Sequence, residues 1–196
     1  AFPELSGDLP GVLSRMRSAG VEAALSVCTT LPEFPAVLAS AAGHDNVYAS
    51  VGVHPDSTGT PEPSVEALVD LARHAKVVAI GETGLDYYRL NGRSVADMQW
   101  QRDRFVAHIR AARTCAKPLV IHTRSASADT LAILREEGGE QAGGVFHCFT
   151  ETAEVARSAL ELGFYISFSG ILTFRNAQDL RDVASFVPLD RLLIET

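Results

Sequence analysis

Five ionisable side chains stand at the ends of short apolar runs, where a metal-dependent reaction would need them. His54 follows "VGV", Glu82 follows "VAIG", His122 follows "LVI", His147 follows "GVF" and Glu195 follows "LLI". Imidazole nitrogens and carboxylate oxygens together suit zinc, manganese, iron or magnesium. If the runs are parallel strands, these side chains gather on one face, because parallel α/β folds place their chemistry at the carboxyl ends of the strands.

Each of these histidines, taken singly, could be a structural residue. Gathering four or five titratable groups without a cation would cost several kcal/mol for each charge left buried and unpaired. Two divalent ions about 3.5 to 4 Å apart would also hold the attacking and the leaving oxygen of a phosphodiester. We therefore predict one or two divalent metal ions, Mg, Mn or Zn, bound at this position.

The elements that must position these groups recur along the chain as β-rich runs, at 21–27, 47–53, 77–82, 118–122, 143–147, 163–168 and 191–195. Segments with helical periodicity separate them, and in 98–113 Phe105, Ile109 and Ala112 fall on one face. Several runs are continuously apolar, as in strands buried on both faces of a parallel sheet. Seven strands alternating with helices, without a break in composition, predict one α/β domain over residues 1–196.

Two architectures fit such a pattern. A doubly wound dinucleotide-binding sheet would need a glycine-rich phosphate loop after the first strand, and the "CTTLPEFP" that follows Val27 is not one. A closed (β/α)8 barrel of the TIM type needs one strand more than the seven visible runs, and that strand could precede residue 1. We predict the barrel, in which Gly81 and Gly84 let the backbone turn tightly beside Glu82.

The composition disfavours several classes of protein. The chain has 196 residues, 46% of them hydrophobic, and 24 acidic against 17 basic side chains give a net charge of -7. This is unlike a disordered chain, and unlike a protein held to DNA or anionic lipid by a broad basic surface. No stretch approaches the ~20 apolar residues of a membrane helix. Cys28, Cys115 and Cys148 form no CxxC pair, so we expect reduced thiols and a cytoplasmic location.

Six motifs resemble, in the same order, those of the TatD family of metal-dependent deoxyribonucleases: "VGVHPD", "IGETGLDYY", "VIHTR", "FHCFT", "SFSGILTFRNA" and "LLIET". The resemblance covers essentially the whole chain. It implies a (β/α)8 barrel related to the amidohydrolases, with Glu82, His122 and His147 as metal ligands. It also implies that a metal-activated water cleaves the phosphodiester bonds of DNA, as a 3'-5' exonuclease acting on single strands without sequence preference.

Two parts of that family's site fall outside this sequence. In the family an HxH pair precedes a segment similar to "FPEL" at residues 2–5, and the last strand reads ETD, whose aspartate is a ligand; this chain starts after the first and stops at Thr196. We therefore expect a barrel domain incomplete at both ends, without its first strand and C-terminal helices. Glu151 stands where the family commonly has glycine, and we expect this carboxylate to affect substrate preference more than the metal site.

Several neighbouring side chains have a functional and a structural interpretation. His54 is a catalytic proton carrier or substrate contact, or it caps a strand before proline. Arg124 binds a substrate phosphate or pairs with a nearby acid. Asp86 binds the substrate, orients a ligand histidine or is a turn residue. Tyr87 and Tyr88 stack on a base or pack.

The predicted function is a metal-dependent DNA phosphodiesterase with Glu82 and His54 as catalytic residues. One alternative is an amidohydrolase-like enzyme acting on a non-nucleotide ester, amide or lactone. Another is a nucleic-acid or partner-binding protein with a vestigial site. A metal-free barrel isomerase or aldolase would need a lysine at a strand end, and neither Lys76 nor Lys117 is placed so. His44, His74 and His108 are interpreted as surface or packing residues.

Overall fold

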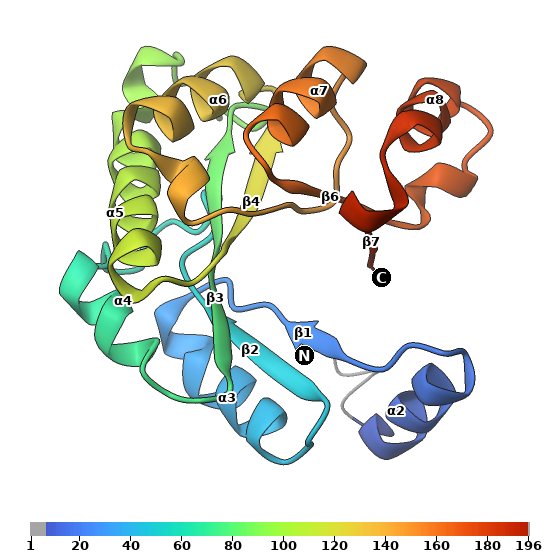
Figure 1. The fold of residues 1–196 in the computed structure, drawn as a ribbon. Helices are drawn as coiled ribbons and strands as arrows, with labels where there is room; N and C mark the ends of the chain where they lie inside the picture. The colour runs from blue at the N-terminus through green and yellow to red at the C-terminus, as the bar shows by residue number, and fades with distance from the viewer. Residues whose placement is uncertain (1–6, 196) are drawn as a thin grey trace.

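The computed structural model describes residues 7–195 and shows seven parallel strands in one curled sheet, with helices along its outer side (Figure 1). The strands are β1 (Ala24–Ser26), β2 (Val47–Val51), β3 (Val77–Asp86), β4 (Leu119–Arg124), β5 (Gly144–Phe146), β6 (Tyr165–Phe168) and β7 (Leu192–Ile194). Their order in the sheet is their order in the chain. The predicted TIM-type α/β architecture is confirmed as this curled sheet, in which β1 and β7 are edge strands within residues 7–195. The expected "FPEL" segment and Thr196 lie outside the described residues.

Helices alternate with the strands, as expected. They are α2 (Leu9–Ser18), α3 (Phe34–Ala42), α4 (Val65–Leu71), α5 (Gln99–Cys115), α6 (Ser127–Glu136), α7 (Ala153–Glu161) and α8 (Gln178–Phe186). Short 3-10 helices lie at η1 (Leu31–Glu33), η2 (Ala96–Met98), η3 (Gly139–Gln141), η4 (Gly170–Thr173) and η5 (Leu189–Arg191). Ser64 begins α4 by accepting a hydrogen bond from the Ala67 amide, a favoured way to satisfy the free N–H groups of a helix start.

The core lies between the sheet and the helices that cover it. Phe105, Ile109 and Ala112 of α5 are fully buried, as their spacing predicted. Strands β2 to β4 are also mostly buried on both faces, which explains their continuous apolar runs. No helix within residues 7–195 is both long enough and apolar enough to cross a bilayer.

Strand β3 differs from the prediction because it does not end at Glu82. It continues to Asp86 and pairs with β4 as far as Asp86–Arg124. Gly81 and Gly84 have φ angles of 137° and 130°, and a side chain at either glycine would collide with the β4 backbone. The two glycines therefore permit a close approach of β4, where a tight turn was expected, and this approach brings His122 beside Glu82.

Candidate metal centre

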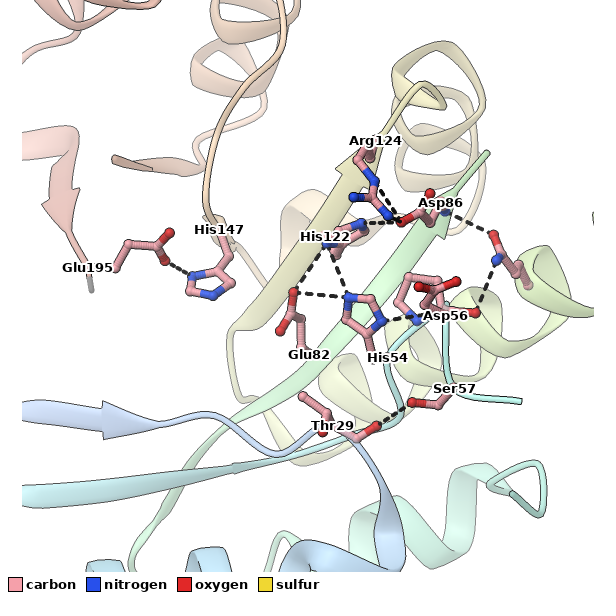
Figure 2. A network of polar contacts seen from close by, with 12 residues as sticks. Thr29, His54, Asp56, Ser57, Glu82, Asp86, His122, Arg124, His147 and Glu195 are labelled. Atoms are coloured by element: carbon pink, nitrogen blue, oxygen red, sulfur yellow. Dashed lines mark hydrogen bonds and ion pairs between the residues drawn. The ribbon is translucent and has the colours of Figure 1, made fainter. Parts of the chain in front are cut away.

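Three side chains from neighbouring strands meet at the carboxyl end of the sheet (Figure 2). His54 follows β2, Glu82 lies within β3 and His122 lies within β4. The Glu82 Oε1 atom is 3.5 Å from His54 Nε2 and 3.3 Å from His122 Nδ1, and the two imidazole nitrogens are 3.3 Å apart. One potential ligand atom of each residue lies within 4.8 Å of the others.

The far side of the His122 ring is held by a buried carboxylate. His122 Nε2 is 3.2 Å from Asp86 Oδ2, and Arg124 donates to the same oxygen from Nε at 2.9 Å and from Nη2 at 2.5 Å. The Asp86 side chain has no exposed surface. A metal-binding histidine usually donates a hydrogen bond from its second ring nitrogen to a carboxylate, which fixes the orientation of the ring. The contact with Asp86 is of this kind, and it leaves Nδ1 of His122 directed at Glu82.

At His54 the ring nitrogen that faces away from the cluster accepts a hydrogen bond, whereas at His122 it donates one. The Nδ1 atom of His54 accepts a hydrogen bond from the Asp56 amide at 3.0 Å. Burial lowers the pKa of His54 below its ordinary value, so the ring is neutral at pH 7 and carries one proton. Because Nδ1 uses its lone pair as an acceptor, we assign that proton to Nε2, which faces Glu82 and His122.

The charges within the cluster are coupled. Burial alone would raise the pKa of Glu82, but the hydrogen bond with His122 and the nearby histidines outweigh burial and lower it. Burial likewise favours neutral His122, yet hydrogen bonds to Asp86 and Glu82 raise the pKa of His122 to about 9. Hydrogen bonds from His122 and Arg124 overcome burial and hold the pKa of Asp86 far below its usual range. Without a cation, the excess negative charge is therefore balanced by a proton on His122.

His147 lies apart from the three-residue cluster and pairs with Glu195 through Nδ1 (Figure 2). Both residues come directly after strands, β5 and β7, as expected. Burial would lower the pKa of His147, but the hydrogen bond to Glu195 and the charge of Glu82 raise it. The negative charge of Glu82 thus acts on His147 even though no hydrogen bond joins them among the described residues.

Of the remaining predicted residues, Arg124 and Tyr88 are at least partly exposed, whereas Tyr87 and Asp86 are buried. Arg124 lies over the ring of Tyr88, with 4.8 Å between the guanidinium carbon and the ring centroid, and Tyr88 is 66% exposed. Tyr87 instead packs: it is buried, and its hydroxyl donates to Asp129. Asp86 ends β3 in a buried ion pair, and its Oδ1 accepts a hydrogen bond from the Tyr88 amide at 2.9 Å, as a turn residue does.

Glu151, the residue expected to affect substrate preference, is partly buried. Burial raises its pKa, and hydrogen bonding to the Ser125 backbone and the Ser127 side chain opposes the rise. Its carboxylate is therefore directed at the connection between β4 and α6. The substrate preference assigned to Glu151 stays a prediction.

Sequence reasoning missed the polar residues of α5 that lie behind the site. Gln101, Arg104 and His108 are nearly fully buried, and all three contact the segment that carries His54. His108 was interpreted as a surface or packing residue, and the structure places it in the core as a hydrogen-bonding residue. Their spacing of i, i+3 and i+7 places them on one side of α5, but the sequence does not show that this side is buried.

The residues present suit a divalent metal ion. A carboxylate oxygen and imidazole nitrogens converge, which is a donor set that zinc and related divalent ions accept. His122 already has the carboxylate partner that metal-binding histidines normally have. The curled parallel sheet and this cluster at its carboxyl end are typical of barrel enzymes that use a metal ion.

Comparisons with known proteins agree with this class. The chain matches the family described as TatD related DNase over residues 1–196. "Uncharacterized metal-dependent hydrolase YcfH" of Escherichia coli (strain K12) is 50% identical, over 100% of this chain and 72% of the relative. "3'-5' ssDNA/RNA exonuclease TatD" of Klebsiella pneumoniae (strain 342) is 35% identical, over 98% of this chain and 73% of the relative. The crystal structure of YJJV, a TatD homologue from Escherichia coli, superposes with a TM-score of 0.86 at 29% identity and covers 100% of this chain and 74% of that one.

The chain belongs to the TatD family and is a metal-dependent hydrolase of that family. The resemblance inferred from the six motifs is thereby confirmed.

Proposed function

We propose that this protein hydrolyses phosphodiester bonds of single-stranded DNA, working from the 3' end without sequence preference, in the cytoplasm and as a single barrel domain. The observation that carries the proposal is the convergence of Glu82 Oε1 and His122 Nδ1 at 3.3 Å beside an assigned N–H of His54. The name of the Klebsiella relative supports the nucleic-acid substrate and the direction of digestion.

Glu82, His122 and His147 would hold the metal ion or ions. Nδ1 of His122 is directed at Glu82 because Asp86 occupies Nε2, and Nε2 of His147 is the nitrogen left over because Glu195 occupies Nδ1. A bound Mg, Mn or Zn ion would supply Lewis-acid chemistry, lowering the pKa of water and offsetting charge on the phosphate. Asp86 orients His122 in this proposal and does not contact the substrate, since its side chain is fully buried.

His54 donates a hydrogen bond. Its assigned Nε2–H faces the same space as the metal-binding atoms, so it can bind a phosphate oxygen or the oxygen that leaves phosphorus. Hydrolysis breaks one P–O bond and forms another with water, and the proton that the water gives up ends on the departing oxygen, while neutral His54 keeps its own proton. A fixed donor at an oxygen on which charge develops contributes about 10²- to 10³-fold to kcat.

Arg124 and Tyr88 are placed to hold the nucleotide. The guanidinium of Arg124 is partly exposed beside the centre, and the exposed ring of Tyr88 offers a face on which any base can stack. Contacts of this kind carry no sequence information, because phosphate and stacking contacts are common to all bases. A local site of this kind is compatible with the net charge of -7.

The test is cleavage of 5'-labelled single-stranded DNA in Mg²⁺ or Mn²⁺. We expect a ladder that shortens with time and disappears with EDTA or with Glu82→Gln, which keeps the shape of the side chain but removes its charge. Glu161→Gln on the exposed face of α7 is the matched control and should cleave normally. Intact DNA together with turnover of a nitrophenyl ester or a lactone would replace this proposal with the amidohydrolase-like alternative.

A further inference from the structure

We infer that three buried polar side chains of α5, Gln101, Arg104 and His108, act as positioning residues that fix His54 by holding the backbone of residues 53–57. We call these three residues the α5 clamp. The inference rests on the proposed function for its meaning in catalysis, but the geometry of the clamp is independent of the substrate.

His108 holds the start of the segment. Its Nε2 accepts a hydrogen bond from the Val53 amide at 3.0 Å, and its Nδ1 lies 2.8 Å from the Arg104 carbonyl oxygen, to which it donates. Both ring nitrogens are thus committed, one as acceptor and one as donor. The residue after Val53 is His54, so this bond fixes the backbone immediately before the proposed hydrogen-bond donor.

Arg104 holds the centre of the segment. Its Nη1 donates to the carbonyl oxygens of His54 at 2.7 Å and Ser57 at 2.9 Å. The rest of the guanidinium pairs with Glu62 through Nε at 2.7 Å and Nη2 at 2.5 Å and stacks on the Trp100 ring. Because Glu62 and Trp100 fix the guanidinium from outside, Arg104 presents its remaining donors in a single direction.

Gln101 joins the segment to the other half of the centre. Its Nε2 donates to the Pro55 carbonyl oxygen at 3.0 Å, and its Oε1 accepts from the Asp86 amide at 2.9 Å. Asp86 in turn orients His122. One side chain therefore ties the backbone beside His54 to the backbone of the residue that supports His122.

These contacts have a structural consequence because the segment has no regular structure of its own. Strand β2 ends at Val51, and residues 52–54 continue as irregular chain. The clamp residues are 0 to 3% exposed, and burying such groups is unfavourable unless they are hydrogen-bonded, as all three are here. The Asp56 amide that selects the His54 tautomer belongs to the same segment, so the clamp sets the direction of the proton on Nε2.

The direct test is the tautomer of His54, read from long-range ¹H–¹⁵N correlations of the imidazole nitrogens in metal-free protein. In the wild type we expect one state, with the proton on Nε2. Arg104→Met removes the donors and should give averaged or broadened His54 signals, whereas Arg104→Lys, which keeps one donor, should restore part of the single state. Arg110→Met on the exposed side of the same helix is the matched control and should leave these signals unchanged.

A second readout separates positioning from general stability. Arg104→Met should lower kcat on single-stranded DNA about 10- to 100-fold, as expected for a residue behind a catalytic group. In a His54→Gln background the same substitution should cause almost no further loss, because the clamp acts through His54. If Arg104→Met does not fold by circular dichroism, His108→Phe, which removes the hydrogen bond to the Val53 amide, carries the same two measurements.

Two results would overturn the inference: a single unchanged His54 tautomer in the folded variant, or an equal loss of kcat with and without His54. Failure of the proposed function is distinguishable from both. Wild-type protein that does not cleave DNA, but whose His54 signals respond to Arg104→Met, would refute the nuclease proposal and support the clamp.

Discussion

At the scale of single residues, His54 and His122 face the same carboxylate with opposite chemistry. His122 donates to Asp86 from Nε2 and keeps Nδ1 for Glu82. His54 accepts from the Asp56 amide at Nδ1 and so turns a proton towards the cluster. The proton on His122 Nδ1 balances the charge of the carboxylates, and a cation would replace it. The Asp56 amide instead keeps the proton of His54 on Nε2, so we assign His122 to metal binding and His54 to hydrogen-bond donation.

This assignment predicts that the two histidines respond differently to substitution. His54→Gln should change the dissociation constant for Mn²⁺ by less than about 2-fold, while kcat falls by about 10²- to 10³-fold because the fixed imidazole Nε2–H donor is lost. His122→Gln should weaken Mn²⁺ binding by at least about 100-fold, more than the loss of a supporting residue costs. Isothermal titration with Mn²⁺ and a kinetic assay measure the two quantities.

His74→Gln is the matched control, since His74 is exposed and precedes the amino end of β3, whereas the site lies at the carboxyl ends of the strands. It should alter neither quantity. Equal loss of Mn²⁺ affinity in the His54 and His122 variants would show that both are ligands and that the tautomer assignment is wrong.

The residue types at the strand ends were enough to predict a cluster of functional residues. They were not enough to predict that His54 and His122 have different roles. Glu82, His54 and His122 were predicted because each follows an apolar run, and the structure brings them together. The difference between the two histidines depends on the Asp56 amide, a backbone group present at every residue, and no sequence pattern could single it out. The burial of Asp86 was also not predictable, because an acidic residue two positions after a glycine resembles a turn.

At the scale of elements, β3 and α5 together set the geometry of the site. Gly81 and Gly84 let β3 lie close against β4, while α5 covers β3 with its apolar face and holds the His54 segment with its polar one. The apolar face was predicted from its periodicity. The polar face was not, because glutamine, arginine and histidine on a helix resemble an exposed surface until their burial is known.

The buried histidine of α5 predicts a loss of stability in mild acid. Burial lowers the pKa of His108 from 6.5 to about 4, with Arg104 and Glu62 as its charged neighbours. Between pH 6.5 and pH 4 His108 binds a proton in the unfolded chain but not in the folded one. The contribution of neutral His108 to the unfolding free energy is therefore fully present above about pH 6.5 and is lost as the pH drops towards 4. From pH 7 to pH 5 this histidine should cost about 2 kcal/mol of unfolding free energy.

Urea unfolding at pH 7 and pH 5 measures this difference. His108→Phe cannot be protonated, so its unfolding free energy should fall by about 2 kcal/mol less than that of the wild type over the same interval. The other titratable groups are common to both proteins and cancel in the comparison. If the unfolding free energy of the wild type falls by the same amount as that of the variant between pH 7 and pH 5, His108 is not the buried neutral group described here.

At the scale of the whole molecule, the sequence predicted the alternation of seven strands and helices but placed several boundaries inaccurately. Residues 21–23 were expected in a strand, yet β1 begins at Ala24. β3 was expected to stop at Glu82, yet its pairing with β4 continues because "ETGLD" is buried despite its polar residues. Propensity identifies an element from its apolar centre, whereas its ends depend on partners that are distant in the sequence.

The order of the strands also has a consequence for how the chain acquires its structure. Each strand pairs with the one made just before it, so the sheet can grow in the direction of synthesis through contacts that are close in sequence. The pairing of β3 with β4 runs from Ile80–Leu119 to Asp86–Arg124, whereas β5 pairs with β6 only at Val145–Tyr165 and Phe146–Ile166. In pulse-labelled hydrogen exchange during refolding we therefore expect the amides of β3 and β4 to be protected before those of β6 and β7.

Simultaneous protection of all strands would instead indicate one concerted step. If the order holds, His54, Glu82 and His122 are assembled once β4 has joined β3, because all three precede residue 124. A cation held by Glu82 and His122 would then stabilise what has already folded in the nascent protein, and His147 would join it once β5 has formed.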